Sequence, residues 1–422
     1  MRLNRPLDPA TVDLDSVDLV DSRLYGHGDP HSVWHAMRDR DPVRWHPVGD
    51  DLGFWSITKM EDADLVLRDH TRFTSQRGTM LFLLGKDDPA RGRQMAATDP
   101  PRHNRMRVPL QRALAPKNIE KYREAVREEV RRVLAPALGG EVYDFAEHMM
   151  AMPMATAGRI MDLPRTDWPR LTALTAMSIA PDDPEFAEEG GADATLKLAH
   201  RELFAYFHDI VRERRRNPGD DLISLLLEMD VEGEKIEVGA VLANCYSLLL
   251  GANITTPFVP IAAVEELIGT AGLQEWMNDP DALTTGIDEA VRWASPANHF
   301  MRYAIADVEL RGRRISAGDA VVVWLGAANR DDEYFTDPFA FDFRRKPNKH
   351  VAFGSGPHYC VGHSVARMSL RVLFEEMFAT FSDFELAGQV EHLCSNFVAG
   401  IKHMPIVAKV RSGAGALTGV DR

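Results

Sequence analysis

The chain has 422 residues, of which 45% are hydrophobic and 27% charged, a globular composition that excludes extensive disorder. Its 49 basic and 63 acidic residues give a formal net charge of −14, which argues against nucleic-acid binding because such binding needs a basic face. Three cysteines are too few for a disulfide framework, and we see neither a leader peptide nor a run of about 20 apolar residues, so we expect a cytoplasmic protein that contacts no membrane.

Helical patterns dominate the chain, because apolar residues recur at three- and four-residue spacing in several long Ala-, Leu- and Glu-rich segments. Strand-like runs are fewer and shorter. In chain order we expect a helix at 33–40, strands at 43–46 and 54–57, helices at 60–69, 116–138, 195–216 and 240–269, strands at 300–305 and 320–324, and a helix at 365–378. The sequence therefore predicts one large domain, 1–422, that is mainly α-helical with a minor β part, and whose residues 1–25 form an irregular arm.

The segment 353–362 reads Phe-Gly-Ser-Gly-Pro-His-Tyr-Cys-Val-Gly and carries the clearest chemistry. Its glycines allow close approach of the backbone, and a helix is expected just after Cys360, so N–H groups would stabilise a thiolate there. Zinc is disfavoured because no second cysteine lies at ligand spacing, and a dinucleotide loop because its third glycine is missing. We interpret Cys245 and Cys394 as small buried apolar residues.

This segment resembles the haem-ligand loop of the cytochrome P450 family, Phe-Gly-x-Gly-x-His-x-Cys-x-Gly, at all six fixed positions. The resemblance extends from about residue 30 to residue 408. It implies the P450 fold and haem b, iron protoporphyrin IX, with Cys360 as the metal ligand. Phe353, Gly354 and Gly362 would be further cofactor-binding residues.

A second resemblance is the family's Glu-x-x-Arg, here Glu289 and Arg292, which lies 71 residues before Cys360. Alone, an i,i+3 ion pair is common on helices. In this order the pair would fix the segment that leads to the cysteine loop. The family often adds an arginine in a following segment, where this chain has Ala340; Arg344 or Arg345 is the expected substitute.

The two haem propionates need cations in an apolar slot. By resemblance these are His103 and Arg107, which are four residues apart and so share one helical face, together with Arg302 and His358. The distal side would come from the helix containing Gly251, Ala252, Thr255 and Thr256.

That distal segment resembles the family's oxygen-activating stretch, in which Thr255 is the hydroxyl and Ile254 occupies the place of the usual acid. Pro257 and Pro260 should distort the helix. With Ile254 unable to supply protons, we expect the proton route to use Thr255, water and Asn253, or the substrate itself. The alternative for Thr255 is a structural hydrogen bond to the Gly251 carbonyl.

The resemblance also indicates a substrate pocket and an electron-transfer surface. The pocket residues would be Met80, Leu81, Phe82, Leu83, Met95, Asn244, Leu248, Ala297, Asn298, His299, Phe397 and Val398, an apolar lining with a few polar groups. The basic residues Arg102, Arg105, Arg112, Lys117, Arg345, Lys346 and Lys349 would meet an acidic electron donor.

The resulting hypothesis is a P450 monooxygenase that uses O₂ to hydroxylate or otherwise oxidise an apolar small molecule, such as an intermediate of secondary metabolism. Electrons would come from a separate ferredoxin or flavodoxin with its reductase, because the chain has no room for a redox domain. One alternative is a P450 that closes a ring or couples aryl groups without inserting oxygen. The other is a non-catalytic haem-thiolate sensor or carrier.

Overall fold

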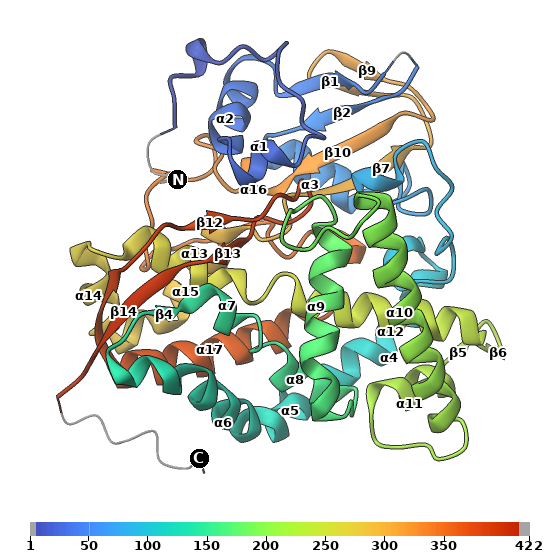
Figure 1. Cartoon of the computed structure of the whole chain (residues 1–422). Coiled ribbons are helices and arrows are strands. Elements are labelled where there is room, and N and C mark those ends of the chain that lie inside the picture. The colour runs from blue at the N-terminus through green and yellow to red at the C-terminus, as the bar shows by residue number, and fades with distance from the viewer. Residues whose placement is uncertain (1–5, 50, 413–422) are drawn as a thin grey trace.

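The computed structural model describes residues 6–49 and 51–412, which form mostly helices with a small β part (Figure 1). This confirms the predicted fold class. The helices are α1 (Arg23–Gly26), α2 (Pro30–Arg40), α3 (Met60–Arg68), α4 (Arg102–Ala113), α5 (Pro116–Ile119), α6 (Arg123–Leu134), α7 (Phe145–Met149), α8 (Met154–Ile160), α9 (Trp168–Ile179), α10 (Ala192–Arg214), α11 (Leu222–Glu228), α12 (Val238–Asn253), α13 (Phe258–Leu267), α14 (Ala271–Met277), α15 (Leu283–Ala294), α16 (Leu325–Ala328) and α17 (His363–Thr380). The strands are β1 (Val43–Pro47), β2 (Gly53–Ile57), β3 (Phe73–Thr74), β4 (Tyr143–Asp144), β5 (Asp230–Val231), β6 (Glu234–Lys235), β7 (His299–Ala304), β8 (Val308–Leu310), β9 (Arg313–Ile315), β10 (Ala320–Trp324), β11 (Phe381–Leu386), β12 (Glu391–His392), β13 (Ile401–His403) and β14 (Pro405–Val410).

The largest sheet has five strands in the order β1-β2-β10-β7-β3. Every residue of its central strand β10 is buried. Because alternate side chains point to opposite sides of a strand, both faces of the sheet are covered there. Val321 and Val323 pack with residues of α3, whereas Val322 packs with residues of α2. β7 pairs antiparallel with β10 and places Arg302 opposite Val321. The covered sheet therefore gives Arg302 a fixed position.

The helical part is built around α12 and α17, which both run through the interior (Figure 1). α12 packs against α10, α11 and α8, and α17 packs against α6 and α15. Glu376 of α17 accepts hydrogen bonds from Arg127 and Arg131 of α6, the latter at 2.8 Å from Arg131 Nε. These contacts hold α17, whose first turn follows Cys360.

The expected helix at 240–269 is two helices, α12 and α13, separated by residues 254–257. Pro257 and Pro260 lack an N–H and their rings crowd the preceding turn, so the hydrogen-bond ladder cannot continue across this segment. The interruption lies beside Gly251 and Thr255.

One stretch, Val238–Leu267, is long and apolar enough to cross a membrane by length and composition, contrary to the expectation that no such run exists. In its most apolar window, 67% of the residues are buried inside the protein. The stretch is a core element, as its packing against α10 and α8 shows.

Two further expectations need correction. The helix expected at 116–138 is divided into α5, α6 and short 3₁₀ turns, and Pro136 lies within the last of these. The expected irregular arm is partly ordered: α1 lies within it, Leu19 and Tyr25 are buried, and the Tyr25 hydroxyl donates to the Leu19 carbonyl at 2.8 Å. Residues 1–5 of that arm lie outside the described residues.

Candidate active site

Cys360 lies in a tight loop just before α17. Its N–H donates to the Phe353 carbonyl at 2.8 Å and closes the loop. Gly354 and Gly356 have φ of +73° and +66°, values that favour glycine. A Cβ on Gly356 would lie 2.6 Å from the Cα of Arg68 in α3. Glycine is therefore required at 356 both for the backbone conformation and for the contact with α3.

The surroundings of the Cys360 sulfur oppose the effect of its burial. Burial raises the pKa of the Cys360 thiol, whereas the backbone N–H groups of Gly362 and His363 and the charges of Arg107 and Arg367 act to lower it. These groups favour a thiolate, the form that binds iron.

Cys245 and Cys394 have a different setting. Both are buried, and burial raises the pKa of both thiols. The Cys394 sulfur lies 3.6 Å from His27 Nε2, under α1. Neither cysteine lines the cavity at Cys360.

A cavity of about 150 Å³ adjoins Cys360. It brings together residues that are distant in the sequence, from α4, β7, the cysteine loop and the loop before α4. Cys360, Gly354, His103, Arg107, Arg302, His358 and Met95 are among its lining residues. All four residues expected at the propionates therefore line one cavity.

Two of these four residues are arginines without a carboxylate partner in the described part of the chain. Arg302 is 4% exposed and makes one side-chain hydrogen bond, to the Met301 carbonyl at 2.9 Å. Burial lowers the pKa of Arg302 to about 10 and also lowers the pKa of Arg107, so both remain cations at neutral pH. Arg302 is buried and Arg107 half-buried, and cations withdrawn from water in this way need counter-charges.

The two histidines are neutral. Burial lowers the pKa of His103. Burial, and to a smaller extent the positive charge of Arg302, lowers the pKa of His358 to about 2. Their rings lie 4.4 Å apart between centroids. The Nε2 atom of His103 is fully buried and has no hydrogen-bond partner among the described residues. It is free to bond a ligand in the cavity.

On the distal side, α12 has an open place at Gly251. A Cβ added to Gly251 would meet no atom within 4 Å, although this helix runs through the core. The Thr255 hydroxyl donates to the Gly251 carbonyl at 2.8 Å, which is the structural alternative raised for this residue. Ala252 is half-buried and Thr256 buried. Gly251 is exposed and Thr255 half-buried, and the described residues that line the cavity at Cys360 include none from α12.

Asn253 does not contribute to this opening, contrary to expectation. Its Nδ2 atom contacts Met154 Sδ at 3.3 Å and Thr175 Oγ1 at 3.4 Å, so the side chain points toward α8 and α9. Ile254 is also buried in the core. A proton route at this place therefore has Thr255 but neither Asn253 nor an acid at 254.

Glu289 and Arg292 form a fully buried ion pair, with 0% exposure of both side chains and 2.7 Å between Arg292 Nη2 and Glu289 Oε1. Arg345 is the substitute for the arginine missing at 340, because its Nε lies 3.2 Å from Glu289 Oε2. Arg344 instead pairs with Asp279 near the surface. Arg292 also donates to the Asn329 and Pro338 carbonyls, so the network connects α15 to the chain that precedes the cysteine loop.

The residues expected to line the substrate pocket divide into two groups. Met80, Phe82 and Phe397 line a second cavity, of about 90 Å³ and partly open to solvent, between the loop before α4, the end of α9, α12 and the turn at 394–397. Met95 lines the cavity at Cys360, and Leu248 is half-buried on α12. The others do not line either cavity: Leu81, Ala297 and Val398 are buried core residues, and Leu83 packs against the core.

The three polar residues expected in the pocket are structural tethers. Asn244 donates to the Arg93 and Ala240 carbonyls and accepts from the Met95 N–H. Asn298 donates to the Asn396 carbonyl at 3.2 Å. His299 accepts from the Leu81 N–H at 3.1 Å and lies 3.1 Å from the Asn396 carbonyl, and burial lowers its pKa to about 4. Their polar groups are therefore used within the protein.

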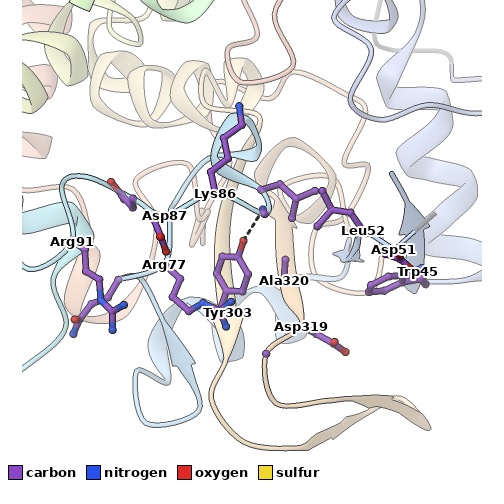
Figure 2. Close-up of a pocket in the computed structure, with 16 residues that line it drawn as sticks. Trp45, Asp51, Leu52, Arg77, Lys86, Asp87, Arg91, Tyr303, Asp319 and Ala320 are labelled. Atoms are coloured by element: carbon purple, nitrogen blue, oxygen red, sulfur yellow. Dashed lines mark hydrogen bonds between the residues drawn. The ribbon is translucent and has the colours of Figure 1, made fainter. Parts of the chain in front are cut away.

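The loop before α4 is also held on its outer side. Figure 2 shows the Arg77 guanidinium beside the ring of Tyr303, at 4.3 Å from the ring centroid. The Tyr303 hydroxyl accepts from the Gly85 N–H at 3.3 Å (Figure 2). None of the residues predicted for the site lines the cleft drawn there. Its residues fasten the loop to β7.

Two residues near Cys360 were not predicted. Ser75 Oγ lies 3.1 Å from His358 Nε2. Arg367 stacks over the Phe353 ring at 4.6 Å and pairs with Asp288 at 3.0 Å. Arg367 follows His363 by four residues and so lies on the same face of the helix. This spacing could have indicated that Arg367 lies near the cysteine loop. Nothing in the sequence around Ser75 indicates its contact.

Haem fits this arrangement. A thiolate at Cys360, one buried and one half-buried arginine without a carboxylate partner among the described residues, and the absence of a side chain at Gly251 suit an iron porphyrin with two propionates. The fold and the site together define a haem-thiolate protein.

Comparison with known proteins identifies the family. The Cytochrome P450 family model matches residues 277–400. Cytochrome P450 NovI of Streptomyces niveus is 31% identical over 93% of this chain and 97% of its own length, and Linalool 8-monooxygenase of Pseudomonas putida is 31% identical over 93% and 99%. The chain belongs to the cytochrome P450 family, binds haem and is an oxygen-incorporating oxidoreductase.

Solved structures agree in fold. P450 OxyD, described as involved in the biosynthesis of vancomycin-type antibiotics, superposes with a TM-score of 0.84 at 33% identity, covering 94% of this chain and 100% of that one. The Mycobacterium marinum cytochrome P450 CYP268A2, solved with pseudoionone, superposes with a TM-score of 0.85 at 28% identity and the same coverage.

Proposed function

We propose that this P450 forms a single domain and hydroxylates an apolar small molecule, an intermediate of secondary metabolism, with electrons from a separate ferredoxin or flavodoxin and its reductase. The observation that carries the proposal is the cavity at Cys360, which adjoins Arg107 and Arg302 on one side while α12 opens at Gly251. A second, mostly apolar cavity lined by Met80, Phe82 and Phe397 supports an apolar substrate.

The test is a turnover assay with ¹⁸O₂, a ferredoxin, its reductase and NADPH, on candidates selected by a substrate-induced spin-state change. Monooxygenation puts one ¹⁸O atom into the product. A product that has lost two hydrogens without gaining ¹⁸O would support ring closure or coupling instead. Haem that neither changes spin state with any candidate nor turns over would support a sensor or carrier.

The chain's own residues have separate tasks in this proposal. When bound, haem supplies the iron at which O₂ is reduced and activated. Cys360 donates electron density to that iron, and the N–H groups of Gly362 and His363 stabilise the sulfur charge. Arg107, Arg302, His103 and His358 would hold the propionates. The missing side chain at Gly251 would leave room for oxygen and substrate beside α12.

Proton delivery depends on Thr255. Oxygen activation consumes protons, and the hydroxyl must release its bond to the Gly251 carbonyl to pass one on. Ile254 cannot supply a proton, and Asn253 points away from the opening. Water beside the interrupted helix, or a polar group of the substrate, therefore completes the route.

Thr255→Ala is expected to divert electrons from product to hydrogen peroxide, so that the peroxide formed per NADPH consumed rises several-fold. Because the hydroxyl bonds only to a helix carbonyl, the variant should keep its haem and its melting temperature. Thr270→Ala is the matched control, since the Thr270 hydroxyl also donates to a helix carbonyl, that of Leu267 at 2.6 Å, and Thr270 is not part of the predicted site. Fully coupled turnover by Thr255→Ala would remove Thr255 from the mechanism.

The electron donor is expected to dock on a smaller basic surface than the sequence indicated. Arg345 is 8% exposed and bound to Glu289, and Arg102 pairs with Glu232 at 2.9 Å. Arg105 also lies 4.0 Å from Glu232. The proximal basic patch therefore consists of the exposed residues Arg112, Lys117, Lys346 and Lys349, of which Lys349 lines a groove at the cysteine loop.

Turnover at subsaturating donor is expected to fall as salt rises, because exposed charges are screened beyond about 10 Å at 0.1 M ionic strength. Lys346→Glu/Lys349→Glu should raise the KM for an acidic ferredoxin several-fold while leaving kcat unchanged. Lys197→Glu/Lys235→Glu, which changes two exposed lysines on α10 and β6, is the charge-matched control. A flat salt series and an unchanged KM in the double variant would contradict this docking surface.

A further inference from the structure

The second cavity, which adjoins the loop between α9 and α10, is apolar over most of its lining. Met80, Phe82, Ile179, Leu196, Leu250 and Phe397 supply apolar side chains from separate segments. A molecule with an apolar body is therefore expected to occupy it. The polar groups of the lining decide what else such a molecule must carry.

Most of these polar groups are already bonded within the protein. Ser178, Ser395 and Asn396 each donate to a backbone carbonyl, and the Tyr246 hydroxyl lies 2.9 Å from His200 Nε2. Asp182 differs. Among the described residues that line this cavity, Asp182 alone carries a formal charge. No other described lining residue forms a hydrogen bond or an ion pair with its carboxylate.

The position of Asp182 is fixed by its neighbour. The Asp183 side chain is fully buried, lies 2.8 Å from Lys402 Nζ and accepts the Cys394 N–H at 2.9 Å. These bonds anchor the beginning of the α9–α10 loop to the turn at 394–397 and to β13. Asp183 therefore uses its own charge inside the protein, while Asp182, one residue earlier, lies at the rim of the cavity.

The charged groups that act on the pKa of Asp182 are themselves carboxylates. Burial raises the pKa of Asp182, and the negative charges of Asp21 and Asp193 raise it further. Asp21 already pairs with Arg23 at 2.8 Å. A positively charged group placed at the rim would be attracted chiefly by Asp182 and Asp193.

We propose that Asp182 is a specificity-determining residue that selects substrates with a protonated or quaternary amine, whose cation lies at the cavity rim while the apolar body fills the cavity. This rests on the proposed function, because it names the substrate class of the same oxidation. Asp182 touches substrate away from the reacting atoms, so it acts on binding and orientation.

The experiment uses the haem-loaded enzyme and two probes of similar apolar length, 4-phenylbutyltrimethylammonium and 4-phenylbutan-1-ol. The quaternary ammonium stays charged at every pH and cannot bind the iron. Affinities are measured by calorimetry, with spin-state spectra recorded in parallel. We expect wild type to bind the ammonium about 10-fold more tightly than the alcohol, which corresponds to about 1.4 kcal/mol.

Asp182→Asn should lower the affinity for the ammonium about 5- to 10-fold and leave that for the alcohol within about 2-fold. Glu309→Gln, which removes an exposed charge on β8 instead, should leave both affinities unchanged. Equal affinities of wild type for the two probes, or an Asp182→Asn variant that keeps the preference, would overturn the proposal. The carbonyl spectrum and oxidation of the alcohol report separately on the P450 function, so the two failures are distinguishable.

Discussion

Cys360→Ala is expected to abolish the red-shifted Soret band of the reduced carbonyl complex and all turnover. The band depends on a thiolate donor to the iron, and the other two cysteines are buried outside the cavity at Cys360. The measurement is the difference spectrum of the reduced protein with and without carbon monoxide. Retention of the band would mean that another residue binds the iron.

Two matched variants separate ligand loss from a general effect of removing a thiol. Cys245→Ala and Cys394→Ala should both keep the band and bind haem in full. Cys245 sits in the core, so its removal is expected to lower the free energy of unfolding by about 1–2 kcal/mol without a spectral change. Loss of the band in either variant would contradict the assignment of Cys360.

Glu289→Ala is expected to be the most damaging substitution outside the cysteine loop. It leaves Arg292 and Arg345 buried without their carboxylate, which should cost about 3–5 kcal/mol and prevent stable haem incorporation. Haem content per polypeptide and the urea unfolding midpoint measure the effect. A haem-replete variant of wild-type stability would show that the network is dispensable.

Its control is an exposed pair. Glu228→Ala removes the partner of Lys235, where both side chains are more than 60% exposed, and should change stability by no more than about 1 kcal/mol.

Burial acts to raise the pKa of Glu289, but Arg292 and Arg345 outweigh it and hold that pKa below its ordinary value. The stabilisation by Glu289 is therefore present above about pH 4 and is lost as the pH falls through the lowered pKa.

Motifs with fixed spacing allowed part of the site to be predicted from the sequence. Cys360, Arg107, Arg302 and His358 were expected at the cofactor and line one cavity, because each is placed by a local element whose pattern is readable. The fold class followed from helical periodicity in the same way. The break in the helix at 254–257 was only partly foreseen, since proline marks a distortion but does not say whether the helix ends.

The walls of the cavities could not be predicted in this way. Asn244, Asn298 and His299 looked like polar groups available to a substrate, but each finds backbone partners in segments distant in sequence. Arg344 and Arg345 are adjacent, yet one faces the surface and the other Glu289, a choice made by tertiary packing. Asp182 and Asp183 are a further adjacent pair of this kind, because tertiary packing buries Asp183 against Lys402 and leaves Asp182 at the second cavity.

The tethers divide the inner surface of the enzyme into two kinds of residue. Asn244, Asn298 and His299 bond backbone atoms and so determine where the surrounding chain runs, whereas Met80, Phe82 and Phe397 fill space at the ends of those fixed segments. The shape of the cavity and the course of the backbone around it therefore depend on different residues. Evolution or a laboratory library can therefore change which substrates fit by replacing the cavity-lining residues. The residues that bond backbone atoms would preserve the course of the chain around the cavity and the haem site.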